Sequence, residues 1–317
     1  MNSTEPRRII KFGNSSYVIS LPISWVKENN LKKGDLVYLE KNGKDELVIL
    51  PTKHDTGNNG KEIVIDAANK DAETLKREIT SAYSRDFAKL IIKNGADSRE
   101  LIDRTFSYLT GLNVSTNVNG EIIAQDILNA KEISINNVEK EIGRTVRMML
   151  KLFRDGISSK TSIKLSKDIE ILDKGVNKSY FLIRRLHRRG CILDNPGDDK
   201  FHKLLSMVYF SLNMEQIGDE IKAVARLLSN TRLNADDLGK TIKITSMLDS
   251  SFATVLESYF NEDIDLALNS MTTVKYKIIK QCNSLIKTSS NKNIEDVAER
   301  LKSISRHMYY ILKVVIY

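Results

Sequence analysis

The spacing of apolar and polar residues divides the chain into three zones. Up to about residue 52, apolar and polar positions alternate with a period of two in "YVISL" (17–21), and the short apolar runs "LVYLE" (36–40) and "ELVILP" (46–51) on either side of a turn also predict strands. Pro22 suits the first turn of a short helix, "PISWVKENN", and the Asn-Gly of "KNGK" predicts a hairpin. A unit of about fifty residues with one short helix is too small to bury a stable core, so we expect it to pair with a second copy.

A polar segment follows, and then the pattern becomes mixed. "TKHDTGNNGK" (52–61) lacks periodicity and is rich in glycine and asparagine, which is typical of a linker. Residues 61–130 contain apolar runs that predict four strands, and helical spacing near 71–84 and 98–109 predicts two helices. We expect a small α/β connector there, and it contains no motif that indicates a particular chemistry.

From about residue 134 to residue 317, helical spacing takes over. Breaks such as "RDGISS", "SNTRLNADD" and "KTSSNKN" divide this region into six long helices, typical of a helical bundle. "DKGVNKSYFLIRRL" (173–186) aligns with "NSMTTVKYKIIKQC" (269–282), and "EQIGDEIKAV" (215–224) aligns with "KSISRHMYYI" (302–311). The alignment indicates two tandem three-helix repeats, 134–230 and 235–317. The predicted fold class is therefore multidomain α+β.

Composition sets broad limits on function. The chain has 317 residues, 41% hydrophobic and 28% charged, with a formal net charge of +8. No apolar stretch is long enough to span a membrane and the N-terminus lacks a signal-peptide pattern, so we expect a cytoplasmic protein. The positive charge favours an acidic partner, which leaves nucleic acid, an anionic membrane surface and phosphate as alternatives.

The helical region carries one acidic constellation. Glu215 and Asp219 are spaced i, i+4 in "MEQIGDEIKAV", so both carboxylates lie on one helix face and can address one cation. The alternative is that Asp219 pairs with Lys222 on its own helix while Glu215 faces water. In the second repeat the equivalent residues are Lys302 and Arg306, so we predict at most one cation site, in the first repeat.

The densest basic run is "RRLHRRG" (184–190). Its cations suit the C-terminus of a helix, with Gly190 as a left-handed cap, and a surface for an anion or a partner is the alternative. His187 continues an apolar stripe, which favours a packed histidine over a metal ligand. The sequence contains no glycine-rich phosphate loop, H-E-x-x-H or G-x-S-x-G motif, and we do not expect an enzyme.

Residues 10–40, "IKFGNSSYVISLPISWVKENNLKKGDLVYLE", resemble the SpoVT/AbrB family of DNA-binding modules, which includes the MazE antitoxins. The resemblance rests on the basic and aromatic residues before Gly-Asn-Ser, on Leu-Pro at the helix start, and on Leu-x-x-Gly-Asp before a strand. It implies a homodimer whose swapped hairpins form one β-barrel. By position it also implies DNA contacts from Lys11, Asn14 and Ser15, with Arg7 and Arg8 as additions. Tyr17, Ile19 and Leu21 become candidates for the dimer core.

The helical region resembles PhoU, a regulator of phosphate uptake built from two three-helix repeats. "MEQIGDEIKAVARLL" is similar to its E-x-I-G-D motif, and "DKGVNKSYFLIRRL" to its D-x-x-x-D helix, with Asn177 in place of the second Asp. The resemblance implies a divalent metal or an iron cluster held by Asp173, Glu215 and Asp219. The order of the segments matches archaeal PhoU-like regulators, in which an α/β connector lies between the two.

The leading hypothesis is a DNA-binding transcriptional regulator of phosphate homeostasis that dimerises through its N-terminal domain. The alternative is a metal-binding adaptor that contacts a phosphate transporter or sensor kinase through the bundle, with the N-terminal domain only dimerising. An antitoxin would fit the first fifty residues but would leave the helical region without a role.

Overall fold

The computed structural model describes residues 6–13, 16–41, 47–51, 61–85, 87–159, 162–193, 198–229, 231, 233–291 and 293–317. The chain divides into two compact units, Met1–Asn59 and Gly60–Tyr317. This division falls within the segment 52–61, where the sequence predicts a linker. The finer division into four domains stays a prediction.

The first unit consists of two short antiparallel hairpins and one helix. Strands β1 (Ile10–Phe12) and β2 (Ser16–Val18) form one hairpin, and β3 (Tyr38–Lys41) and β4 (Leu47–Leu50) form the other. Helix α1 (Ile23–Glu28) begins directly after Pro22, where a missing N–H costs no helical hydrogen bond. The two hairpins are separate sheets within one chain, so the barrel of a swapped dimer stays a prediction.

The second unit begins with a four-stranded mixed sheet. Strands β5 (Glu62–Asp66), β6 (Lys89–Lys93), β7 (Leu112–Thr116) and β8 (Ile122–Asp126) are ordered β5-β6-β8-β7, and only the β5–β6 pair is parallel. Helix α2 (Ala72–Ser84) connects this parallel pair, and Asp71 caps it by accepting from the Glu73 and Thr74 amides at 3.0 and 2.9 Å. A 3₁₀ turn (Ala96–Ser98) leads into α3 (Arg99–Phe106), and a second one (Ala130–Glu132) precedes the bundle.

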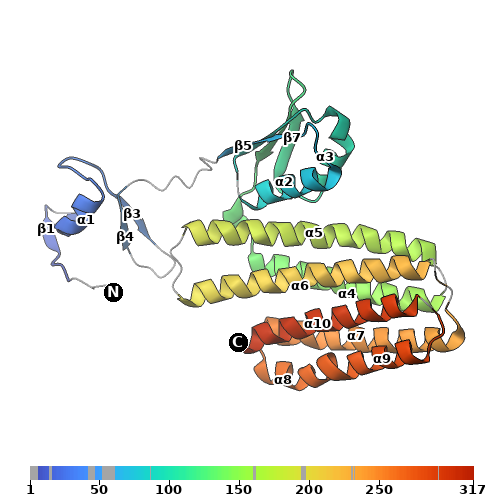
Figure 1. The fold of residues 1–317 in the computed structure, drawn as a ribbon. Coiled ribbons are helices and arrows are strands. Elements are labelled where there is room, and N and C mark those ends of the chain that lie inside the picture. Colours follow the sequence, from blue (N-terminus) through green and yellow to red (C-terminus); the bar gives the residue numbers. More distant parts are fainter. Residues whose placement is uncertain are drawn as a thin grey trace. The chain divides into compact units, whose positions relative to one another are not determined.

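This α/β part has its own core, which meets the helical region at α5. Leu75, Ile79 and Tyr83 follow one face of α2 and are fully buried with sheet residues such as Leu90 and Ile92. Phe181 of α5 (Ser162–Leu193) packs against this core and also against the core of the bundle. In Figure 1, α2 lies alongside α5, in agreement with the contacts between these two helices.

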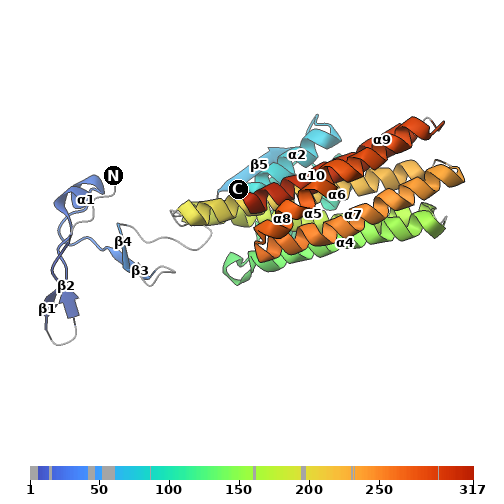
Figure 2. The same ribbon diagram turned by 90° about the horizontal axis from the view of Figure 1, so that it is seen from below.

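The bundle is formed by long helices that run side by side (Figures 1 and 2). The first repeat contains α4 (Ile135–Ser159), α5 and α6 (Asp198–Ser229). The second contains α7 (Ala235–Asn261), α8 (Ile264–Thr272), a π-helical segment (Thr273–Lys277), α9 (Ile278–Thr288) and α10 (Ile294–Ile316). The first helices α4 and α7 pack together, as do the third helices α6 and α10, so equivalent helices of the two repeats meet.

One detail of the helical region goes beyond the sequence prediction. The second helix of the second repeat contains the π-helical segment, which apolar spacing does not reveal because one wider turn hardly changes the pattern. None of the helices in the described ranges is long and apolar enough to cross a membrane.

Candidate functional site

The β1–β2 hairpin carries the basic residues that the sequence predicts for DNA. Arg7 and Arg8 lie just before β1 and are separated from it by Ile9, Lys11 lies within the strand, and all three are exposed. Gly13 follows β1 with φ of +67°, a conformation that favours glycine. Asn14 and Ser15, the other two predicted DNA contacts, lie outside the described residues.

The strand register changes which residues of this hairpin form the apolar face. Lys11 lies directly opposite Tyr17, so the two side chains share one face of the two-stranded sheet. Ile10 pairs with Val18, and these residues occupy the other face together with Phe12. Tyr17 therefore lies on the basic face, and the apolar face consists of Ile10, Phe12 and Val18.

Apolar side chains of the first unit are exposed to an unusual degree. Phe12 and Tyr17 are each 70% exposed, and α1 contains no buried residue. Other large apolar side chains of this unit that are exposed are Ile9, Ile10, Val18, Ile19, Ile23, Leu36, Leu39, Leu47 and Val48. A single copy thus leaves uncovered the surface that would normally form a core, which marks it as an interaction surface.

Two of the predicted acidic residues of the first repeat, Asp173 and Asp219, meet at a lysine between α5 and α6, and Glu215 lies beside Asp219. The Lys222 ammonium lies 2.8 Å from Asp173 Oδ2 and 2.5 Å from Asp219 Oδ1. Asn177 donates to Asp173 Oδ2 at 3.2 Å, and the Gln216 amide donates to Glu215 at 2.7 Å. We call Asp173, Glu215, Asp219 and Lys222 the carboxylate–lysine cluster.

Burial and mutual repulsion shape the electrostatics of this cluster. Burial raises the pKa of Asp173 above its usual value, and the hydrogen bond and charge of Lys222 offset that only in part. Burial also raises the pKa of Glu215, and the neighbouring charge of Asp219 adds to the effect. Burial works to lower the pKa of Lys222, but the two aspartates outweigh it and the pKa is raised.

This arrangement does not fit the metal site that the PhoU resemblance implies. The ammonium of Lys222 sits between two of the three expected ligands, where a bound cation would have to sit. In the described part of the chain, no three His, Cys, Asp or Glu side chains are grouped so as to hold a metal ion. The predicted alternative, an ion pair between Asp219 and Lys222, is present, and it extends across the helix interface to Asp173.

The equivalent positions in the second repeat form a different ion pair. Lys302 is 6% exposed and pairs with Glu299 on its own helix, and Arg306 lies 3.7 Å from the same carboxylate. Burial raises the pKa of the neighbouring Cys282 thiol to about 12, which keeps the thiol protonated.

The basic run at 184–190 does not end a helix. Helix α5 continues through Gly190 to Leu193, so the prediction that Gly190 caps the helix is wrong. Arg185 is fully buried, with Nη2 at 3.2 Å from Asp126 Oδ2 and donating to the Phe87 carbonyl at 3.2 Å. Its guanidinium also lies over the ring of Tyr83, 4.5 Å from the centroid.

Arg189 pairs with the same carboxylate, Asp126. The run therefore attaches α5 to the end of β8. Arg185 and Arg189 bind a carboxylate of the α/β part and do not cap the helix as predicted. His187 is partly buried on this helix, and burial lowers its pKa.

Comparison with known proteins agrees with this division of the chain. Residues 10–57 match the family model described as "Antidote-toxin recognition MazE, bacterial antitoxin". A search of curated protein sequences gives no match. The fold is similar to the crystal structure of PhoU from Pseudomonas aeruginosa, with a TM-score of 0.54 and 19% identity over 58% of this chain and 94% of that one. The chain thus joins a MazE/AbrB-like N-terminal segment to a helical region with the PhoU fold.

Proposed function

We propose that the protein is a cytoplasmic, DNA-binding transcriptional regulator of phosphate homeostasis that acts as a homodimer. The β1–β2 hairpin carries this proposal, because Lys11 lies within the MazE-like segment 10–57, Arg8 lies just before it, and both side chains are exposed. The helical region with the PhoU fold would receive the regulatory signal, from a small ligand or from a phosphate transporter or sensor protein.

The exposed apolar surface supports the dimer. Ile10 and Phe12 are 62% and 70% exposed in one copy and lie on the face opposite Lys11. Two copies that interleave their hairpins would cover this surface and leave the basic faces outward. Sedimentation velocity of the full chain should show a dimer, and replacing Ile10 and Phe12 with Ser should give a monomer. A monomeric parent protein would contradict this part of the proposal.

DNA binding is tested by footprinting on the promoters beside the gene, with and without residues 1–52. The regulator predicts a footprint that disappears on truncation. With fluorescence anisotropy, each phosphate neutralised adds about 0.9 to the slope of log affinity against log salt. Replacing Arg8 and Lys11 with Ala should therefore flatten that slope by up to about 1.8 for each subunit.

A matched control is the replacement of Lys32 and Lys33 with Ala. Both residues are exposed in the same unit but lie outside the hairpin, so this variant loses equal charge and should keep the slope. If both variants behave alike, the hairpin is not the DNA-binding surface. If no footprint appears at all, the protein instead resembles an adaptor that acts through protein contact.

A further inference from the structure

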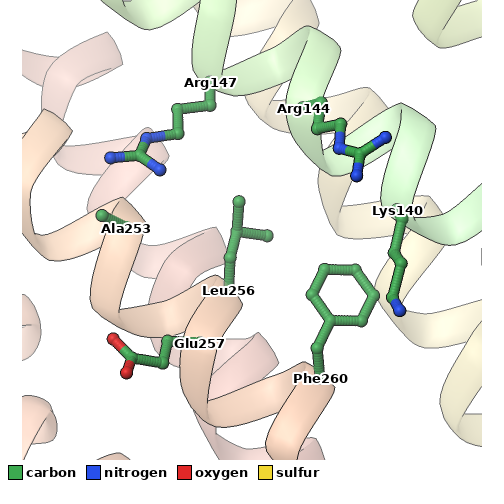
Figure 3. A pocket seen from close by; sticks show the side chains of 7 residues that line it. All are labelled: Lys140, Arg144, Arg147, Ala253, Leu256, Glu257 and Phe260. Atoms are coloured by element: carbon green, nitrogen blue, oxygen red, sulfur yellow. The ribbon is translucent and has the colours of Figure 1, made fainter.

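A pocket of about 480 Å³ lies between α4 and α7, and none of its lining residues belongs to the carboxylate–lysine cluster. Its seven lining residues are shown in Figure 3: Lys140, Arg144, Arg147, Ala253, Leu256, Glu257 and Phe260. This volume is typical of a site for a small molecule. The first three residues come from α4 and the other four from α7.

Side-chain contacts on both sides of the pocket hold these two helices together. At one end the Tyr259 hydroxyl donates to Glu139 Oε1 at 2.7 Å, and at the other end Arg154 pairs with Asp249. Between them, a Cβ added at Gly143 would come within 3.1 Å of Leu256 Cδ2, so the glycine permits the close approach of α4 and α7. The pocket is therefore a built feature of the helix interface.

The α4 side of this pocket is strongly positive. Lys140, Arg144 and Arg147 follow one face of α4, and among the described residues none of the three forms an ion pair or hydrogen bond. The Nε of Arg147 is buried and has no hydrogen-bond partner there. A buried donor without a partner is costly, and a bound acceptor would remove that cost.

The α7 side of the pocket is mostly apolar and contains one acidic residue, Glu257. Leu256 and Phe260 project from α7 toward the cations of α4, and the Glu257 carboxylate is directed away from Lys140 and Arg144 (Figure 3). Glu257 is exposed and forms no ion pair with these cations. The pocket thus combines three available cations with an apolar surface.

We propose that this pocket binds an anion with a chain of phosphoryl groups. Lys140 and Arg147 are seven residues apart, which is about 10 Å along the helix axis at about 1.5 Å per residue. A single phosphate is too short to contact all three cations, whereas a chain of them can follow the helix face. Arginine favours phosphate because its planar fork donates two parallel hydrogen bonds.

Two sources share this chemistry, a nucleoside triphosphate and inorganic polyphosphate. The ring of Phe260 and the side chain of Leu256 offer a surface on which a nucleoside can pack. This surface would not increase the affinity for inorganic polyphosphate. The inference goes beyond the proposed function, because binding to this pocket does not require that the protein bind DNA.

Isothermal titration of the full-length protein with ATP and with tripolyphosphate, without added metal, tests the proposal. We expect saturable binding of at least one, weakened at least about 10-fold when Arg144 and Arg147 are replaced with Ala. The matched control replaces Lys151 and Lys167 with Ala. Both are exposed lysines outside the pocket, and this variant should bind like the parent protein.

Further variants separate the two sources and guard against misfolding. If ATP is the ligand, replacing Phe260 with Leu weakens ATP binding but not tripolyphosphate binding, and equal binding of both points to the inorganic chain. Replacing Lys140 and Arg144 with Gln changes only side chains at the mouth of the pocket and should also weaken binding. The proposal is overturned if neither compound binds at millimolar concentration, or if the control loses as much affinity as the pocket variants.

Discussion

Replacing Lys222 with Met tests whether this lysine is the resident cation of the carboxylate–lysine cluster. The substitution keeps a long aliphatic side chain but removes the ammonium that contacts Asp173 and Asp219 at 2.8 and 2.5 Å. Asp173 then remains as a largely buried carboxylate, with only 11% of its side chain exposed. Removing one partner of a buried ion pair costs about 3–5 kcal/mol, and an exposed pair contributes about 0–1 kcal/mol.

The cost of removing the Lys222 ammonium should lie between these two limits. The side chains of Lys222 and Asp219 are 20% and 45% exposed, so solvent screens part of the interaction. We therefore expect the free energy of unfolding to fall by about 1–3 kcal/mol at pH 8. Urea denaturation followed by circular dichroism measures this. Replacing the exposed Lys174 with Met is the control and should stay within about 0.5 kcal/mol of the parent protein.

The loss of stability in the Lys222→Met variant should become smaller as the pH falls. Burial already raises the pKa of Asp173, and loss of the ammonium raises it further. The folded variant then holds a proton at pH values where the unfolded chain has released it, so its stability increases as pH falls toward the unfolded value of 3.8. The difference between variant and parent should therefore be smaller at pH 5 than at pH 8. An equal difference at both pH values would refute the role of Lys222 as the counter-ion.

The same variant addresses metal binding. Without the ammonium, the carboxylates of Asp173 and Asp219 lose their shared counter-ion, so Mn²⁺ should bind the variant more tightly than the parent protein. Titration followed by the electron paramagnetic resonance of free Mn²⁺ measures both affinities. Equally tight binding by the parent protein would show that a metal, rather than Lys222, neutralises this site.

Three further predictions concern the second unit. Replacing Asp126 with Ala leaves the buried guanidinium of Arg185 without this partner, so the free energy of unfolding should fall by about 3–5 kcal/mol. Hydrogen exchange in β8 and α5 should become faster, and unchanged exchange there would contradict the role of Asp126 in holding α5 to β8. In a Cys191→Ser variant, Cys282 should resist Ellman's reagent at pH 8 until the protein unfolds, because burial raises its pKa to about 12, and rapid labelling of the native protein would disprove this. Replacing Gly111 with Ala should lower the melting temperature, since φ is +77° and the new Cβ would lie 2.8 Å from Leu128 Cβ; an unchanged melting temperature would refute the argument.

The sequence predicts the elements of this protein closely where a local signal exists. The spacing in "FAKLIIK" and "EIIAQDI" predicts β6 and β8, which the structure places at Lys89–Lys93 and Ile122–Asp126. The repeat alignment predicts two groups of long helices, and the structure has them with the PhoU fold. These signals are local, because apolar periodicity reports which face of each element is covered.

The candidate sites show where such local signals end. Helical spacing places Glu215 and Asp219 on one face, and it also places Lys222 within reach of Asp219. It does not reveal that Lys222 reaches Asp173, which lies 49 residues earlier in the chain. In the same way, "RRLHRRG" is read correctly as basic, but the burial of Arg185 depends on Asp126 and Phe87 of another layer.

By itself the sequence determined the order of the elements, the covered faces of the long helices and the residue types available for chemistry. Only the tertiary structure decided which charges meet: a lysine between two aspartates, an arginine buried against the α/β part, and three cations beside Phe260 that have no partner among the described residues. The physical reason is that spacing along a helix fixes neighbours on that helix, whereas the partner across an interface is set by how the helices pack.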